Sequence, residues 1–410
     1  MALKNNFCMD KYRKYMNQCF FKRGIPAIIV FVVIFYLLFS DYPYVFDRLV
    51  SLPSIFVNFI FAVIILIILI LGGKRKIRLP NLLMQCIVFQ IIIWFFYAYF
   101  HSDTSYIVRI LFLFVVFLSM IAIKKYSTIK RFVKLNNLLI AFQAIFCFVA
   151  FTLILSGILH PLLEVTNVDN RKLYFFGISC TNDFNEINFA RLSGFFDEPG
   201  ALAFWGIYSL IFNKLFTNNK KIELLLVVGL LGTLSLAYFV QLFFYFVLFY
   251  YDKLKVFIPI ILLLSIGIFI AASNNDRIRE FTIERISNFS FSNNNRSKPS
   301  EIAKEYFKMH PIFGNGAKKI EKTKYMGDNP YELLAKDGIL GMLITYLPLL
   351  WCGLSLRTYR KRKVLFGIFI LMLGYMQRPF HVNMMHYMML FSFMYMTLKY
   401  YNSRYYYVSK

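Results

Sequence analysis

Several signatures of soluble catalysis are missing from this chain of 410 residues. It has no Walker phosphate loop, GxGxxG fingerprint, HExxH pair or GxSxG elbow at a position where such a motif would count. Its six cysteines are scattered, and none of them falls in a CxxC or another metal-binding spacing. The sequence therefore shows no sign of a nucleotide, NAD, zinc or a serine nucleophile, and we expect neither a cofactor nor a metal.

Acidic residues are scarce as well. The chain has 21 Asp and Glu against 46 Lys and Arg, which gives a formal net charge of +25. In a soluble protein this excess would suggest a nucleic-acid partner. Here the basic clusters Lys74–Arg78, Lys124–Lys134 and Arg357–Lys363 alternate with apolar segments, which the positive-inside rule of membrane proteins explains. We therefore expect membrane lipid around the chain and no nucleic acid.

Apolar residues are abundant: 59% of the chain is hydrophobic, 19% is aromatic, and the mean hydropathy is +0.58. Segments such as Pro53–Leu71 match the roughly 20 apolar residues that a membrane helix needs. The composition predicts an all-α polytopic membrane protein, with residues 1–410 as a single integral membrane domain. We expect twelve transmembrane helices, near residues 25–40, 53–71, 82–100, 106–123, 135–158, 200–216, 222–236, 238–251, 256–271, 338–353, 364–376 and 385–400.

The apolar stretch 222–251 allows two interpretations. It could be one tilted helix, although thirty helical residues reach roughly 45 Å against a hydrocarbon core of about 30 Å. It could also be a tight hairpin broken around Gly232, Thr233 and Ser235. With a single helix, the short basic loop Arg357–Lys363 would face outward, against the positive-inside rule. We therefore predict the hairpin, with both chain termini inside.

This topology places two polar loops on the same outer side, residues 159–199 and the long loop 272–337. The long loop is predicted to be partly helical, because Arg277–Phe289 and Glu301–His310 each place their apolar residues on one helical face. Both are expected to lie on the membrane surface. Between them, Ser292–Ser300 has the composition of a turn-rich linker.

The segment Arg191–Gly200 brings one arginine and two carboxylates to the mouth of an apolar span. Charge beside a bilayer is costly and often functional. Arg191 could be an interfacial anchor, but the neighbouring Asp197 and Glu198 favour a functional role. Glu198 and Pro199 also fit a helix start, and a helix N-terminus that points outward favours an anion. The structural and functional interpretations can therefore both hold.

Arginines and carboxylates beside lipid suit a diphosphate-linked lipid substrate. Arginine grips phosphate oxygens in pairs and keeps its proton, so several arginines can stabilise a departing diphosphate without a metal. A partly desolvated carboxylate can take a proton from a sugar hydroxyl. Besides Arg191, we consider Arg296, which has no acidic neighbour, and Arg378, which could equally be an anchor. Asp328 precedes Asn329 and Pro330, where a turn is expected.

Two stretches resemble known motifs. Arg191–Gly200 (RLSGFFDEPG), which runs directly into a span, resembles the motif of O-antigen and capsule repeat-unit polymerases, the Wzy family. His310–Gly316 (HPIFGNG), followed by Gly327–Gly341 (GDNPYELLAKDGILG), resembles the PxFGxG … HNxYLxxLxxxGxxG pattern of the wider superfamily of polymerases and O-antigen ligases. Arg296 stands where that superfamily often has an arginine, and Gln377-Arg378-Pro379 is also similar to polymerases.

The resemblance implies an inverting, metal-independent glycosyltransferase of the GT-C type. It implies a multi-pass protein of the bacterial inner membrane, with its active site facing the periplasm. The substrates would be oligosaccharide repeat units on undecaprenyl diphosphate, and a separate chain-length regulator would be a protein partner. Diphosphate would bind Arg191, Arg296 and Arg378, and the catalytic base would be Glu198, Asp197 or Asp328.

The sequence departs from the ligase branch at two positions. Asp328 stands where that branch has a histidine before the Asn, so a histidine base does not carry over to this chain. The arginine of the ligase TxSR turn has no counterpart, because Leu234–Ala237 (LSLA) stands there. The missing arginine favours a polymerase over a ligase.

Two alternatives remain at the level of sequence. An O-antigen ligase would perform the same chemistry on a lipid A-core acceptor, and its loss would leave no repeat units on the surface lipid. A lipid-linked oligosaccharide flippase would share the length, the spans and the basic charge. A transporter should carry charges in the middle of its spans, whereas here the spans are nearly charge-free and Arg109 lies close to an outer end.

Overall fold

A computed structural model of the chain describes residues 59–60, 62–67, 79–123, 126–166, 172–177, 179–181, 190–196, 198–253, 297–323, 329–356, 361–378 and 384–408, with a few positions between 259 and 279. The expected span 25–40 and most of the expected spans 53–71 and 256–271 lie outside these residues.

The described residues are mostly α-helical, and the chain is a membrane-embedded protein. Four helices within this part are long and apolar enough to cross a bilayer: α4 (Asn81–Phe100), α5 (Ser105–Ala122), α6 (Tyr126–Leu155) and α15 (Glu332–Ser355). The other helical elements are α7 (Pro199–Phe212), η1 (Asn213–Thr217), α8 (Lys220–Gly229), η2 (Leu230–Thr233), α9 (Leu236–Phe249), η3 (Tyr251–Lys253), α11 (Asp276–Arg279), α13 (Ser297–Met309), α14 (Ala317–Thr323), α16 (Lys361–Gln377) and α17 (Met384–Val408).

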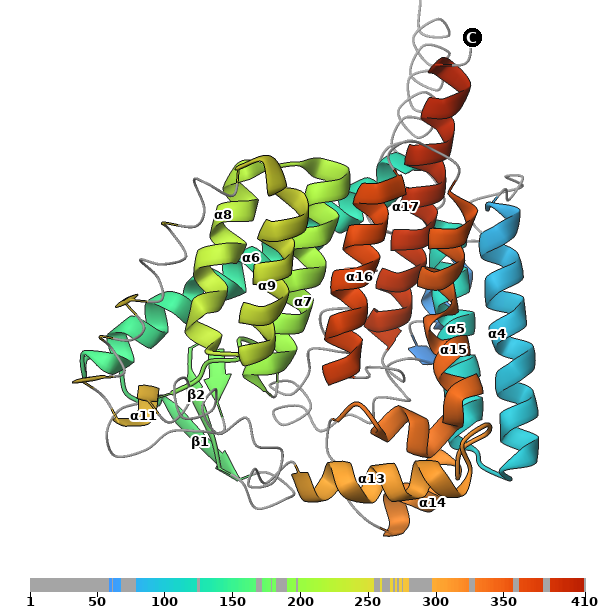
Figure 1. The fold of residues 1–410 in the computed structure, drawn as a ribbon, viewed down its shortest axis with the longest axis horizontal. Helices are drawn as coiled ribbons and strands as arrows, with labels where there is room; N and C mark the ends of the chain where they lie inside the picture. The colour runs from blue at the N-terminus through green and yellow to red at the C-terminus, as the bar shows by residue number, and fades with distance from the viewer. Residues whose placement is uncertain are drawn as a thin grey trace, which may run out of the picture.

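The core of the bundle is built around α17. This helix packs against α4, α5, α6 and α15, and its residues 384–396 are buried without interruption. Figure 1 shows α7, α8, α9, α16 and α17 standing nearly parallel, while α13 lies across one end of the bundle. The sheet described below lies at the same end, which is called the loop end from here on.

Helix α6 is longer than the sequence indicated. The expected span began at residue 135, but the helix begins at Tyr126 and runs for 30 residues. It therefore includes Lys130, Arg131 and Lys134, which the sequence argument assigned to a connecting loop. A helix of this length reaches about 45 Å, so its basic first turns can extend beyond an apolar core of about 30 Å. Hydropathy marks the apolar part of a helix rather than its end.

The predicted hairpin at 222–251 is confirmed. Leu234 adopts a positive φ of 45° between η2 and α9, which ends the first arm. The two arms then run antiparallel: the Tyr238 hydroxyl donates to the Val227 carbonyl oxygen at 2.7 Å, and the Tyr245 hydroxyl donates to Glu223 at 2.6 Å. The tip of the hairpin therefore lies at the loop end.

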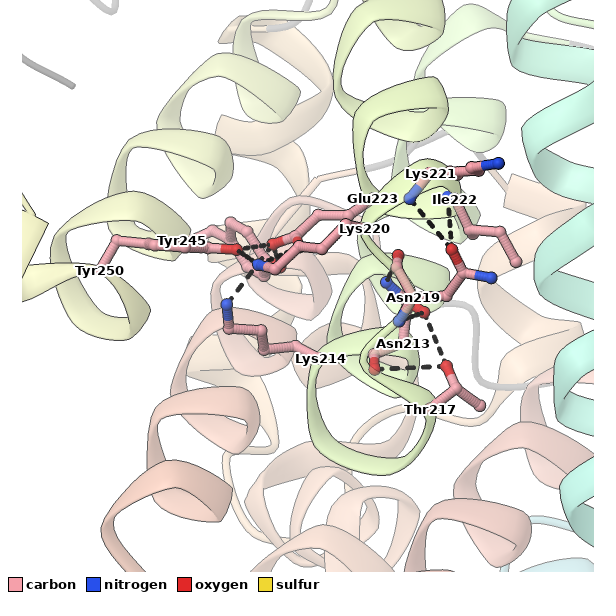
Figure 2. Close-up of polar contacts among 10 residues, drawn as sticks. All are labelled: Asn213, Lys214, Thr217, Asn219, Lys220, Lys221, Ile222, Glu223, Tyr245 and Tyr250. Carbon is pink, nitrogen blue, oxygen red and sulfur yellow. Dashed lines mark hydrogen bonds and ion pairs between the residues drawn. The ribbon is translucent and has the colours of Figure 1, made fainter. Parts of the chain in front are cut away.

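A cluster of charged and phenolic groups closes the base of this hairpin (Figure 2). The Glu223 carboxylate is 2.9 Å from Lys220 Nζ and 3.5 Å from Lys214 Nζ, and it also accepts hydrogen bonds from Tyr245 and Tyr250. Because Lys214 belongs to η1, which continues α7, the cluster joins the hairpin to the neighbouring helix. These contacts hold α7, α8 and α9 in one unit.

The expected all-α class needs one correction. The loop 159–199 contains a three-stranded antiparallel sheet in the order β1 (Leu163–Thr166), β2 (Lys172–Phe176) and β3 (Ser179–Thr181). Val165 pairs with Leu173, and Phe175 pairs with Cys180, so apolar side chains share one face. Such short strands, rich in aromatic and β-branched residues, were not recognised because the segment was considered only as a polar connection.

The second loop agrees better with its prediction. The helix expected at 301–310 is present as α13, which begins earlier, at Ser297. Residues 297–300, which were assigned to the linker, are therefore its first turn, and Pro299 lies in that turn, where a missing N–H costs nothing. Of the helix expected at 277–289, the described residues include only α11.

We predict that Glu223→Gln lowers thermal stability. Glutamine can still accept from Tyr245, but it leaves the mostly buried Lys214 ammonium without its charge partner. Removing one partner of a buried ion pair costs about 3 kcal/mol. The midpoint of thermal unfolding in detergent should fall clearly below that of the wild type. Glu301→Gln, which removes the same charge from an exposed position of α13, should leave the midpoint unchanged. Equal midpoints for the two variants would contradict a stabilising role of the cluster around Glu223.

Candidate functional site

The segment after Ala190 is held in place by the sheet. Ser193 donates from its hydroxyl to the carbonyl oxygens of Cys180 and Phe196, at 2.6 and 2.7 Å. The backbone N–H of Ser193 donates to the Cys180 carbonyl oxygen, and that of Cys180 donates to the Gly194 carbonyl oxygen, both at 3.0 Å. Residues 191–196 therefore run along the edge of β3 and then turn sharply.

Gly194 allows this turn to approach α6. Its φ is +61°, and a Cβ at this position would lie 2.7 Å from the side-chain oxygen of Gln143. The same oxygen accepts a hydrogen bond from the Phe195 N–H at 3.2 Å, while the Gly194 N–H donates to Ser179 Oγ at 3.0 Å. The first motif is thus fixed between β3 and α6, and only a glycine fits its narrowest point.

Arg191 lies beside the tip of the hairpin. Its side chain is half-buried, and Nη2 donates to the carbonyl oxygen of Leu234 at 3.3 Å. Leu234 is the residue with positive φ that ends the first arm of the hairpin. The turn at Leu234–Ala237 has no arginine of its own, and the structure brings Arg191 to it from the sheet loop. A guanidinium therefore stands at this turn although the local sequence lacks one.

Arg378 and Glu198 form an ion pair across 180 residues of chain. Arg378 directly follows α16, and its side chain is 5% exposed, whereas that of Glu198 is 25% exposed. The guanidinium also lies against Gly200, where a Cβ would be 3.0 Å from Nε and 3.1 Å from Nη2. The glycine of the EPG sequence therefore gives the arginine room against the first turn of α7.

The predicted helix start at Glu198–Pro199 is confirmed. Helix α7 begins at Pro199, and Glu198 occupies the N-cap position with an extended backbone. Its carboxylate makes no capping hydrogen bond, because it is directed to Arg378 instead. The N-terminus of α7, which carries partial positive charge, therefore faces the same place as the guanidinium. Both the helix N-terminus and the guanidinium therefore favour an anion at this place.

The second motif forms a rigid frame rather than an array of reactive groups in its described part. The backbone of residues 311–316 runs beside residues 335–340 and exchanges hydrogen bonds with it: Asn315 N–H to Ala335, Gly316 N–H to Lys336, Ile339 N–H to Pro311 and Leu340 N–H to Ile312, at 2.9 to 3.1 Å. Asn315 also donates from its side chain to the Tyr306 carbonyl oxygen at 2.8 Å, which ties α13 to this frame.

Two glycines make this close approach possible. Gly314 and Gly338 have φ of +72° and +68°, and a Cβ on either would overlap the backbone of the opposite segment. Gly338 also has ψ of −172°, so it kinks α15 near its N-terminal end. The His310 carbonyl oxygen accepts a hydrogen bond from the Gly314 N–H at 2.9 Å, and the residue is exposed.

A buried ion pair anchors this frame to the bundle. Arg109 Nη1 lies 2.5 Å from Asp337 Oδ2, and the side chains are 1% and 0% exposed. The Tyr106 hydroxyl donates to the other carboxylate oxygen at 2.7 Å, and the Tyr97 hydroxyl donates to the Asp337 carbonyl oxygen at 2.7 Å. The sequence argument noted Arg109 but missed its partner. The position of Asp337 at the edge of the expected span 338–353 was the available signal, because an arginine inside a bilayer needs a carboxylate.

The α4–α5 turn holds the other side of the frame. The His101 Nε2 atom lies 3.0 Å from the Phe313 carbonyl oxygen, so Nε2 must carry a proton. Burial lowers the pKa of His101 below its usual value, although this hydrogen bond acts in the opposite direction. Burial alone would raise the pKa of Asp103, but the backbone N–H groups of Lys318 and Ser105 outweigh it and keep the pKa low. A neutral imidazole and an ionised carboxylate thus fix residues 313–318.

The six predicted site residues fall into two groups. Glu198 and Arg378 are brought together, and Arg191 lies seven residues before Glu198 on the same fixed segment. Asp197, Asp328 and Arg296 lie outside the described residues. No protein-family model matches the chain, and no match was found among curated proteins. The functional interpretation therefore depends on the motifs and on this geometry.

We predict that Gly338→Ala weakens the frame. The new methyl group would overlap the Ile312 carbonyl, and alanine disfavours the φ of +68°. The combined cost should be about 2 kcal/mol or more. Limited trypsin digestion should then cleave at the exposed Lys318 and Lys319 faster than in the wild type.

Gly267→Ala is the matched control for this change. A Cβ at Gly267 meets no atom within 4 Å, so the same substitution should leave the rate of cleavage unchanged. Equal rates for the Gly338 variant and the wild type would show that the frame does not depend on this approach.

Proposed function

We propose that the protein is a polymerase of lipid-linked oligosaccharide repeat units in a bacterial inner membrane. It would transfer the growing glycan from undecaprenyl diphosphate to the next lipid-linked unit at the periplasmic face. The pairing of Glu198 with Arg378 at the start of α7 supports this proposal most strongly, because it joins a possible base to a possible diphosphate ligand. The motif resemblance supplies the substrate class.

The charges at the loop end suit this chemistry. Arg191 and Arg378 come from different parts of the chain: Arg191 lies on the segment that leads into α7, and Arg378 contacts the end of that segment at Glu198. Guanidinium groups bind phosphate oxygens in pairs, and they stabilise negative charge that develops on a leaving diphosphate. The N-terminus of α7 adds its partial positive charge. Arg296 is proposed as a third ligand from the long loop.

The proposed reaction is a single displacement. An acceptor sugar hydroxyl loses its proton to a carboxylate, and its oxygen forms a bond to the anomeric carbon of the donor. The bond between that carbon and the diphosphate oxygen breaks at the same time, so the configuration inverts. Glu198 is the described candidate for the base, and Asp197 and Asp328 are the others. No nucleotide is consumed, because the lipid diphosphate is already an activated leaving group.

The buried pair of Arg109 and Asp337 bears on the transport alternative. A flippase should carry charge along a path through the middle of its spans. Arg109 is the fifth residue of α5 and Asp337 the sixth of α15, so the pair lies near one end of both helices. Both side chains are fully buried and paired. This position favours an anchor for the loop end over a transport path.

We predict that the purified protein in lipid nanodiscs extends synthetic undecaprenyl-diphosphate repeat units into a ladder of products. Arg191→Lys should slow the ladder at least about 100-fold, because lysine keeps the charge but loses the paired donors of guanidinium. The ladder should persist with a chelator. Gel electrophoresis of the products, with a time course, provides the measurement.

Arg279→Lys is the matched control, since Arg279 is an exposed arginine whose partner is Asp276 on the same short helix. It should support ladder formation at the wild-type rate. A normal rate for Arg191→Lys would remove the argument from paired donors. A ladder that disappears with chelator would contradict the metal-independent mechanism.

A further inference from the structure

In the ion pair of Glu198 and Arg378, the carboxylate occupies the Nη2 donor group of the guanidinium. An arginine that donates to a carboxylate cannot offer the same N–H to a diphosphate. A carboxylate that holds a guanidinium is also a weak proton acceptor, because the neighbouring positive charge stabilises its ionised form. The pair as it stands is therefore a resting arrangement, and Glu198 must leave it to act as a base.

The surroundings of the pair favour an anion at this place over a bare guanidinium. Arg378 is almost completely buried and lies against Gly200, in the first turn of α7. A cation beside a helix N-terminus is unfavourable, and only a nearby negative charge offsets it. Glu198 supplies that charge, although as the N-cap residue it could have capped the helix instead. The carboxylate thus occupies a position that suits an incoming anion.

The two partners differ in how easily they can leave. The backbone of Arg378 is held at the end of α16, where its N–H donates to the Gly374 carbonyl oxygen at 2.9 Å, and its guanidinium is buried against Gly200. The Glu198 side chain is 25% exposed and makes no capping hydrogen bond. Glu198 is therefore the mobile member of the pair, and Arg378 is the fixed one.

We propose that Glu198 is an internal competitor for the diphosphate at Arg378, and that arrival of the donor displaces its carboxylate and frees it as the base. This inference rests on the proposed function. A diphosphate carries more negative charge than a carboxylate and offers oxygens for two donors, so it replaces Glu198 at Nη2 of Arg378. The released carboxylate becomes more basic once it has lost the guanidinium. It then accepts the proton of the acceptor hydroxyl. The hydroxyl oxygen forms a bond to the anomeric carbon as the bond between that carbon and the diphosphate oxygen breaks. Base activity is thereby confined to the donor-bound state.

The test is a double-mutant cycle on binding alone. Full-length protein in detergent is titrated with undecaprenyl diphosphate, and the bound fraction is measured by native mass spectrometry. Glu198→Gln should bind about tenfold more tightly than the wild type, because the competing charge is gone. Arg378→Gln should bind more weakly. In the double variant the gain from Glu198→Gln should vanish, since no guanidinium remains to compete for.

Two further arms complete the design. Inorganic pyrophosphate as competitor separates recognition of the diphosphate from recognition of the lipid. It should bind the Glu198→Gln variant more tightly than the wild type. Glu301→Gln, an exposed carboxylate of α13, removes the same charge and should change affinity less than twofold. Size-exclusion profiles show whether each variant is folded.

The outcomes separate the inference from the proposed function. Unchanged or weaker binding by Glu198→Gln overturns the competition. The same gain in the Arg378→Gln background also overturns it, because the effect would then be a general change of charge. If the wild type forms no ladder but Glu198→Gln still binds about tenfold more tightly, the polymerase assignment fails and the competition stands.

Discussion

A charge that leaves water for the interior of a membrane protein needs an opposite charge or several hydrogen bonds inside the protein. Much of the described structure follows from this constraint. Arg109 is paired with Asp337 at the junction of α4, α5 and α15, and Glu223 is surrounded by lysines and tyrosines at the base of the hairpin. Each pair ties together helices that apolar packing alone would leave free to slide, because lipid competes equally well for apolar faces.

The ion pair of Glu198 and Arg378 differs from the pairs formed by Asp337 and Glu223. The carboxylates of Asp337 and Glu223 each have two or more partners and are at most 8% exposed, whereas Glu198 has one described partner and is 25% exposed. An ion pair that serves only as an anchor is more stabilising when it is closed to solvent and when all of its carboxylate oxygens accept hydrogen bonds. A pair in which one member is open to solvent can exchange partners at lower cost. Exposure therefore separates the Glu198–Arg378 pair from the anchoring pairs.

Local and electrostatic rules predicted part of this structure from sequence. The charge of the loop before α16 predicted the hairpin of α8 and α9, and the sequence Glu198–Gly200 predicted the start of α7. The sheet β1–β3 was missed, because its strands are short and their pairing depends on contacts across the loop. The pairing of Glu198 with Arg378 could not be predicted either, since no local pattern relates residues 180 positions apart. Helix starts and the hairpin were thus predictable from local sequence, whereas the sheet and the long-range ion pair were not.

The two sequence motifs have different roles in the structure. In the described part of the second motif, the glycines permit backbone contact and Asn315 ties α13 to α15, so these residues shape a frame. The first motif also uses its glycines for close approach, but it carries Arg191 and Glu198 on the same fixed segment. The sheet and α6 hold this segment at the loop end, where partial desolvation strengthens the effect of such charges on an anion. The contacts that position the first motif therefore come from the sheet and α6, and the described frame of the second motif anchors α13 and α15 to the α4–α5 turn.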